Sequence, residues 1–322
     1  MPYTNPAIVD QHYPENHGFD LNIGGREWGQ PKGVGKYFHP FAMPNMDSQP
    51  GDFLTDRLTD YAVGFIEENK EKPFLLYFSY YTVHSPFMGK PDLVKKYREK
   101  AAKGDYRQTD PDYAAMVESL DDSVGRVISK LKEEGLADNT LIIFTGDNGS
   151  DRHDYTAGLR NCKAYAYEGG VRVPLFVAGL GIPAGQKIDT PAIGMDLYPT
   201  ILDITGLSLK PSQHVDGISL KPILYGTSEP VDRALFWHYP HYHRTPPYGA
   251  VVKDDYKLIE FFEDGSLELY NLKNDPSEST NLSAAQKDLA AELLAELRQW
   301  RTHVGAQMMA LNPVHSSQPK KE

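Results

Sequence analysis

The chain has 322 residues, of which 40% are hydrophobic and 24% charged, and its formal net charge is −11. These values predict a globular protein with one large core and a smaller appended unit, and they disfavour a general nucleic-acid binder, which needs a basic surface. No apolar run approaches the roughly 20 residues of a membrane span, and the single cysteine, Cys162, excludes an internal disulfide.

The first fifty residues are rich in Pro, Gly, Asn and His, which predicts ordered loop with short strands. Apolar residues then recur at helical spacing from Leu54 to Ile66, which predicts a helix. The run "KPFLLYFSYY" that follows predicts a buried strand. A short helix is expected over residues 92 to 99. A longer helix is expected after Asp110, which we predict to cap it.

The middle of the chain alternates strands and helices. Strands are expected over residues 140 to 145 and in "VRVPLFVAG", and a short helix in "DLYPTILDITG". A polar loop follows each strand, which is typical of an α/β sheet. Ligands of such sheets gather at the carboxyl ends of the strands, and both His84 and Asp147 follow a predicted strand.

The pattern changes near residue 226. The segments "ALFWHYP", "GAVVKDDYKLIEFF" and "SLELYNL" predict short strands, and a helix of about 18 residues begins near Ser283. This indicates a smaller antiparallel sheet with one covering helix. We therefore predict a catalytic domain over 1–225, a subdomain over 226–312 and a disordered tail over 313–322.

The first candidate site is the sequence "TGDNGS", which contains Asp147 and Asn148. Carboxylate and amide oxygens suit hard cations such as Ca²⁺ or Mg²⁺. The alternative is a plain turn, because Asp, Asn and Gly are common turn residues. Two ligands also fall short of the roughly six oxygens that these ions need. The residues alone leave both readings open.

Two further residues could contact an anion. His84 in "YTVHSPF" could donate a hydrogen bond or pass a proton, and Lys163 could meet an anionic oxygen as a point charge. Taken alone, each residue has a simpler explanation. His84 would be a hydrogen-bonded histidine at the end of a strand, and Lys163 would be a solvated lysine on the surface. Cys162 is expected to be a small packed residue.

Three histidines stand close together in "FWHYPHYHR", namely His238, His241 and His243. No cysteine or carboxylate joins them at the spacing of a metal site. We prefer a polar, aromatic rim that contacts a ligand. Sugars suit such a surface because their ring faces pack on aromatic rings while their hydroxyls meet polar groups.

Several sequence segments, taken together in their order along the chain, resemble a known family, although no single segment is specific enough to do so. "KPFLLYFSYYTVHSPF", "IIFTGDNGS", "LRNCKAYAYEGGVRVPLFVAG", "DLYPTILDITG" and "KLIEFFEDGSLELYNLKNDPSESTNL" together resemble the type I sulfatases of the alkaline-phosphatase-like superfamily. The opening "YPENHGFDLNIGG" is similar to relatives of arylsulfatase A and N-acetylgalactosamine-6-sulfatase. The resemblance implies a central mixed sheet between helices, with a smaller carboxyl-terminal antiparallel sheet.

The resemblance also implies roles for individual residues. Asp147 and Asn148 match one pair of ligands to the family's divalent ion, usually Ca²⁺ with Mg²⁺ possible. Lys163 matches the lysine that contacts the sulfate, although the family more often has Gly where Cys162 stands. His84 matches the histidine that contacts the sulfate ester and helps to protonate the leaving group. His238 and His241 are also expected to contact the substrate, on the chemistry of the aromatic rim described above and not on the resemblance.

Some elements that the resemblance leads us to expect are missing. Sulfatases use a formylglycine made within Cys/Ser-x-Pro-x-Arg, and the sequence contains no such motif. The family's first ligand pair, two adjacent aspartates, and its "GKWHLG"-like block are missing too. These elements precede the "YPENHGFD" segment in the family, so we expect that the amino-terminal part is absent.

The expected function is thus hydrolysis of a sulfate ester, with a sulfated small molecule or glycan as the partner. The substrate is expected to be a sulfated carbohydrate, and the chain is expected to be inactive alone because its active site is incomplete. A non-catalytic protein that binds sulfated glycans and a phosphoesterase of the wider superfamily are the alternatives. By family analogy, the full-length protein is expected to be periplasmic or secreted.

Overall fold

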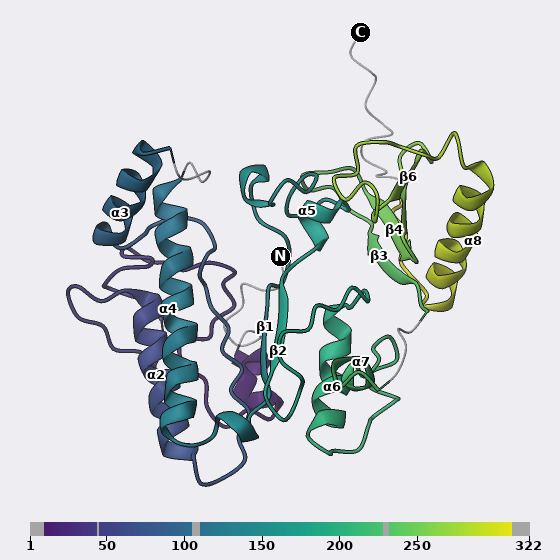
Figure 1. Ribbon diagram of the computed structural model, residues 1–322. Coiled ribbons are helices and arrows are strands. Elements are labelled where there is room, and N and C mark those ends of the chain that lie inside the picture. Colours follow the sequence, from purple (N-terminus) through teal and green to yellow (C-terminus); the bar gives the residue numbers. More distant parts are fainter. Residues whose placement is uncertain (1–9, 44, 105–109, 228–231, 311–322) are drawn as a thin grey trace. The chain divides into compact units, whose positions relative to one another are not determined.

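Figure 1 shows a computed structural model of the chain, in which residues 10–43, 45–104, 110–227 and 232–310 are described. The chain divides into two compact units, Met1–Thr140 and Leu141–Glu322. The predicted domain limit after residue 225 falls inside the second unit. The predicted disordered tail, 313–322, lies outside the described residues.

Three α-helices dominate the first unit: α2 (Leu54–Asn69), α3 (Pro91–Ala102) and α4 (Pro111–Glu133). All three were predicted. Asp110 caps α4 as expected, because its carboxylate accepts a hydrogen bond of 3.1 Å from the backbone N–H of Tyr113. Helix α4 packs against both α2 and α3, and the short 3₁₀ helix η4 (Ala137–Asn139) follows it.

The amino-terminal segment is ordered loop, as predicted, but the expected short strands are wrong in its described part. It contains the 3₁₀ helices η2 (Asp10–His12) and η3 (Pro14–His17) and a single β-bridge between Phe38 and Phe53. Tyr37 is fully buried beside Phe53, and both belong to a core that includes Leu54 and Met116. This packing joins the loop to α2 and α4.

The prediction of a buried strand over "KPFLLYFSYY" is wrong. Residues 74–80 form no backbone hydrogen bond to another segment within the described part of the chain. Alternate side chains face opposite ways: the ring of Phe74 packs against Phe65 of α2, whereas Leu75 is 62% and Tyr77 75% exposed. The apolar run therefore covers the helices with one face only, and no ladder fixes it.

The second unit begins with the predicted strands β1 (Ile142–Thr145) and β2 (Leu175–Ala178), which pair antiparallel with Ile142 opposite Ala178. Between them lie the 3₁₀ helix η5 (His153–Tyr155) and the single-turn helix α5 (Glu168–Val171). The predicted helix "DLYPTILDITG" is α6 (Leu197–Ile204), preceded by η6 (Gly194–Asp196) and followed by the short α7 (Lys221–Leu224).

Four antiparallel strands close the unit in the order β3-β4-β5-β6, over Leu235–Tyr239, Tyr248–Lys253, Tyr256–Phe261 and Leu267–Asn271. Helix α8 (Lys287–His303) covers one face, where Leu258 packs with Leu293 and Leu297. This confirms the predicted carboxyl-terminal sheet with one covering helix, although α8 begins four residues after Ser283.

The other face of this sheet packs on the loop before α5. Successive residues of a strand point to opposite faces, so Ile259 lies on the face opposite Leu258. There it joins a core with Tyr248 and Tyr270 of the sheet and with Ala166 and Tyr167 of the loop. Within the described residues, no helix has the length and apolarity needed to cross a membrane.

Candidate functional site

Strand β1 ends in the turn formed by residues 146–150, called here the Asp147 turn. Asp147 is exposed and Asn148 half-buried. Neither side chain has a hydrogen-bond partner within the described part of the chain. Both oxygens are therefore free to bind an ion, whereas in an ordinary Asx turn the side chain would bond its own backbone.

Two backbone hydrogen bonds join the Asp147 turn to residues 160–170, called here the Lys163 loop. The N–H of Gly149 donates to the carbonyl of Gly170 at 2.9 Å, and the N–H of Lys163 donates to the carbonyl of Ser150 at 2.7 Å. A Cβ on Gly149 would lie 2.0 Å from the carbonyl oxygen of Gly169. Only glycine permits such a close approach of two backbones.

Lys163 is half-buried on this loop, and its ammonium has no hydrogen-bond or ion-pair partner among the described residues. Next to it, Cys162 is only 4% exposed and packs as the small residue that was predicted. The structure therefore brings Asp147, Asn148 and Lys163 onto two adjoining loops of one unit. Their free carboxylate, amide and ammonium groups could bind a cation and an anion side by side.

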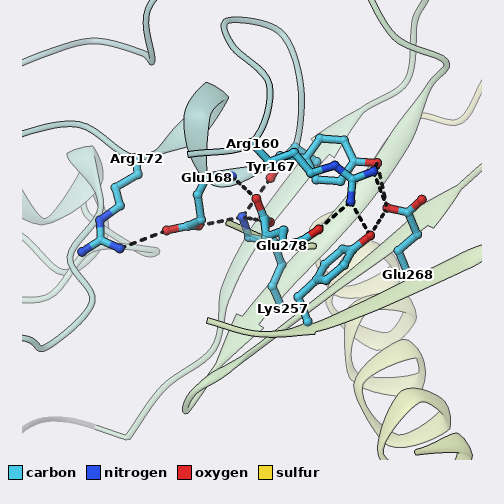
Figure 2. Close-up of polar contacts among 9 residues, drawn as sticks. Arg160, Tyr167, Glu168, Arg172, Lys257, Glu268 and Glu278 are labelled. Atoms are coloured by element: carbon cyan, nitrogen blue, oxygen red, sulfur yellow. Dashed lines mark hydrogen bonds and ion pairs between the residues drawn. The ribbon is translucent and has the colours of Figure 1, made fainter. Parts of the chain in front are cut away.

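A polar network attaches the start of the Lys163 loop to the carboxyl-terminal sheet (Figure 2). The Arg160 guanidinium lies over the ring of Tyr167, 4.0 Å from its centroid, and donates to the Tyr270 hydroxyl at 2.7 Å. Both tyrosine hydroxyls donate to Glu268 at 2.7 Å. Burial, together with these bonds to Glu268, raises the pKa of Tyr167, so the phenol remains a hydrogen-bond donor.

The predicted histidine rim divides into two kinds of residue. His238 uses Nε2 to donate to the carbonyl of Gln307 at 2.7 Å. His241 is exposed, and its ring centroid lies 4.0 Å from that of Tyr239. Arg244 of the same connection between β3 and β4 forms a 2.5 Å ion pair with Asp151, the residue after the Asp147 turn. The connection that contains His241 is therefore joined through Arg244 to the residue that follows the Asp147 turn.

His84 belongs to the first unit and follows residues 74–81, which do not form the strand that was predicted to precede it. Its Nδ1 lies 2.9 Å from the carbonyl of Ser85, which can only accept, so Nδ1 carries the proton and Nε2 remains available. The hydroxyl of buried Tyr37 donates to the carbonyls of Tyr81 and His84 at 2.7 and 2.8 Å. These contacts hold the backbone of the histidine in place.

The described residues contain no group of three or more His, Cys, Asp or Glu side chains that could hold a metal ion. Asp147 and Asn148 fit a hard cation by chemistry, but they supply only part of its coordination. A groove of about 740 Å³ in the first unit is lined by α2 and α4, including Asp56 and Arg126. None of the predicted site residues lines it.

Sequence reasoning missed residues that hold the two site loops, such as Arg160 and Arg244. Each contacts a partner far along the chain, such as Tyr270, which is 110 residues from Arg160. No local spacing marks such pairs. The block "LRNCKAYAYEGG" contains Arg160 and Lys163 together, which is the one signal that could have drawn attention to Arg160.

Two family models match the chain. Residues 4–207 match the model described as sulfatase, and residues 161–303 match the model described as N-sulphoglucosamine sulphohydrolase, C-terminal. The chain therefore belongs to the sulfatase family, and the resemblance drawn from its ordered blocks is confirmed.

Relatives and solved structures agree with this assignment. A sulfatase of Formosa agariphila is 37% identical over 301 residues, which are 84% of this chain and 54% of that protein. An N-acetylglucosamine-6-O-sulfatase of Bacteroides thetaiotaomicron is 32% identical over 203 residues, or 59% of this chain and 36% of that protein. The chain thus spans about half the length of the first of these relatives and a smaller share of the second.

The crystal structure of Ps i-CgsB in complex with k-i-k-neocarrahexaose matches 90% of this chain and 68% of its own, with a TM-score of 0.76 and 26% sequence identity. This likeness to solved sulfatases confirms the predicted alkaline-phosphatase-like α/β class, with its small antiparallel carboxyl-terminal sheet.

Proposed function

We propose that this chain supplies the cation- and sulfate-binding residues of a sulfatase that acts on a sulfated carbohydrate. The observation that supports this most is the pairing of the Asp147 turn with the Lys163 loop. Two hard oxygen ligands and one unpaired ammonium lie on loops joined through Ser150 and Gly170. A sulfate ester presents anionic oxygens that both a cation and a lysine stabilise.

The proposed roles follow from the free atoms. Asp147 and Asn148 would bind a divalent cation, Ca²⁺ or Mg²⁺, which when bound supplies charge stabilisation to the sulfuryl oxygens. Lys163 would donate to a sulfate oxygen as a point charge. In the first unit, His84 keeps Nε2 free because Nδ1 is bonded to the Ser85 carbonyl. When the ring is protonated at both nitrogens, the Nε2 proton is the one that we assign to transfer to the leaving alcohol, which leaves the neutral imidazole with its proton on Nδ1.

The carbohydrate assignment is supported by chemistry and by two of the matched proteins. His241 is exposed, its ring lies tilted against that of Tyr239, and Tyr242 is 66% exposed, which suits sugar rings. The relative from Bacteroides thetaiotaomicron is named for a sulfated amino sugar, and Ps i-CgsB has a crystal structure in complex with k-i-k-neocarrahexaose. We assign the sugar contact to His241 in preference to His238, because the Nε2 atom of His238 is already hydrogen-bonded to the carbonyl of Gln307.

The test is calorimetric titration of the full chain with glucosamine 6-sulfate in the presence of calcium, with unsulfated glucosamine as the comparison ligand. We expect Lys163→Ala to weaken binding of the sulfated sugar about tenfold, the effect of one charge-assisted hydrogen bond. Lys187→Ala, which removes an exposed lysine paired with Asp189 in the same unit, should leave the affinity unchanged. Equal affinity of the Lys163→Ala variant and the wild type would refute the assignment.

A non-catalytic role in binding sulfated glycans and a superfamily phosphoesterase remain the alternative proposals. Both are compatible with a lysine beside a cation site. A phosphoesterase would bind glucosamine 6-phosphate in preference to the sulfate, and a second titration with the phosphate ester compares the two anions directly.

A further inference from the structure

Both ends of the Lys163 loop meet at one buried residue, Glu278, in the turn after β6 (Figure 2). At one end, Arg160 donates to the backbone carbonyl of Glu278 at 2.7 Å. At the other, the backbone N–H of Glu168 donates to the Glu278 carboxylate at 2.7 Å. Glu278 is fully buried and adopts a φ of 54°, which is uncommon for a residue other than glycine.

Lys257 of β5 lies between the two glutamates and has 0% exposure. Its ammonium donates to Glu168 at 2.6 Å, to Glu278 at 2.9 Å and to the carbonyl of Ala166 at 3.1 Å. Three acceptors match the three N–H donors of a lysine. We call Lys257, Glu168 and Glu278 the buried ion cluster.

The carboxylates of Glu168 and Glu278 lie close together and are shielded from water. The cluster therefore needs the positive charge of Lys257. Burial raises the pKa of Glu278, and the positive charge of Lys257 opposes that rise. Arg172 contacts Glu168 at 3.4 Å but is largely exposed. Removing one partner from a buried ionic group leaves an uncompensated charge, whereas replacing both partners with apolar residues is often neutral for stability.

The loop between these attachments contains Lys163. The N–H of Gly169 donates to the carbonyl of Arg160 at 2.9 Å, which closes the loop, and Lys163 is joined to Ser150 of the Asp147 turn. The position of the Lys163 ammonium therefore depends on a closed loop whose two ends are attached to the carboxyl-terminal sheet and its following turn.

We propose that Lys257 is a positioning residue for the sulfate-binding site: it contacts no ligand, but through Glu168 and Glu278 it fixes the loop that carries Lys163. The inference rests on the proposed function only for the ligand that Lys163 meets. The attachment of the loop itself is measured without any ligand.

A buried ion cluster could instead serve global stability alone. The two possibilities differ in which amides exchange faster when Lys257 is replaced. A stability role predicts that all amides of the sheet exchange faster together. A positioning role predicts faster exchange at Gly149 and Lys163 in a molecule whose sheet is intact.

The experiment compares the full-length wild type with Lys257→Met, with the double variant Lys257→Met/Glu278→Met and with Lys253→Met. The double variant removes both charges of the fully buried pair, so it should remain folded even if the single variant does not. Lys253 forms a 3.0 Å ion pair with Glu296 between β4 and α8 and does not touch the Lys163 loop. Its variant is therefore the matched control.

Hydrogen exchange followed by mass spectrometry gives the first readout. In the double variant we expect peptides that contain Gly149 and Lys163 to exchange about tenfold faster or more, with peptides of β4 and β5 within about twofold of the wild type. Lys253→Met should leave the exchange rates of the Asp147 turn and the Lys163 loop unchanged. Wild-type exchange in the Lys163 loop of the double variant, or equal acceleration throughout the sheet, would overturn the inference.

The affinity for glucosamine 6-sulfate, with calcium present, gives the second readout. We expect the double variant to bind at least about fivefold more weakly, and Lys253→Met to bind as the wild type does. Unchanged affinity despite a mobile loop would overturn the positioning role. If the wild type itself binds no sulfated sugar, the proposed function fails, and the exchange measurement alone then decides whether Lys257 fixes the loop.

Discussion

Purified protein of this sequence should release no measurable sulfate from glucosamine 6-sulfate, even when it binds the sugar. The sequence contains no Cys- or Ser-x-Pro-x-Arg from which formylglycine could be made, and its single cysteine, Cys162, is followed by Lys163 and Ala164. Removing the nucleophile from an enzyme lowers turnover by a factor on the order of 10⁶. Binding and charge stabilisation alone would remain.

Ion chromatography of released sulfate measures this directly, with glucosamine 6-phosphate as a parallel substrate. Lys163→Ala serves as the control for contamination, because a contaminating enzyme is unaffected by a change in this chain. Sulfate release that disappears in Lys163→Ala would show that the chain is itself an active sulfatase, against our expectation. Phosphate release that disappears in the same variant would favour the phosphoesterase alternative.

Gly149→Ala should destabilise the protein and disrupt the site, although it adds one methyl group. The new Cβ would stand 2.0 Å from the carbonyl oxygen of Gly169 and within 2.9 Å of the carbonyl carbons of Gly169 and Gly170. Backbone atoms cannot move aside as a flexible side chain can. We expect a loss of about 3 kcal/mol in the free energy of unfolding, with loss of sulfated-sugar binding.

The same turn contains a matched control. A Cβ on Gly146 would meet Val173 at 3.4 Å, an ordinary van der Waals contact. Gly146→Ala should therefore leave the free energy of unfolding within about 0.5 kcal/mol of the wild type. Urea denaturation of both variants gives the comparison. Equal effects of the two substitutions would contradict the close packing of the Asp147 turn on the Lys163 loop.

The carboxyl-terminal sheet was predictable because its short apolar and aromatic segments are separated by turns such as "EDGS". In β5, Leu258 faces α8 and Ile259 faces the loop before α5, so both faces are buried and apolar residues do not alternate with polar ones. Helix α4 was predictable for a similar reason, since Asp110 and Pro111 mark its start. Local rules suffice where the local pattern and the packing agree.

The segment "KPFLLYFSYY" shows where such rules fail. Its composition is typical of a buried strand, but a strand needs a partner as well as a composition. Residues 74–80 pair with none of the described segments, and Leu75 and Tyr77 are left largely exposed. Pairing is a property of two distant segments, which a single run of residues cannot reveal.

The ligand role of Asp147 and Asn148 was proposed from the sequence, by the order of the blocks around them, and it stays a prediction. The residues that hold the two site loops in place were not predicted. Lys257 was not recognisable, because a lysine in a strand is ordinarily exposed. Its burial depends on Glu278, 21 residues away, and on Glu168, 89 residues away. Only the folded chain brings these charges together.

Calcium titration of the metal-free chain tests most directly whether the Asp147 turn binds a divalent cation beside Lys163. We predict one saturable site with a dissociation constant on the order of 1 mM, weakened about tenfold or more in Asp147→Ala. Asp154→Ala, which removes an exposed carboxylate from the segment that follows, should bind as the wild type does. Equal calcium affinity in all three proteins, or no saturable site in the wild type, would contradict the claim.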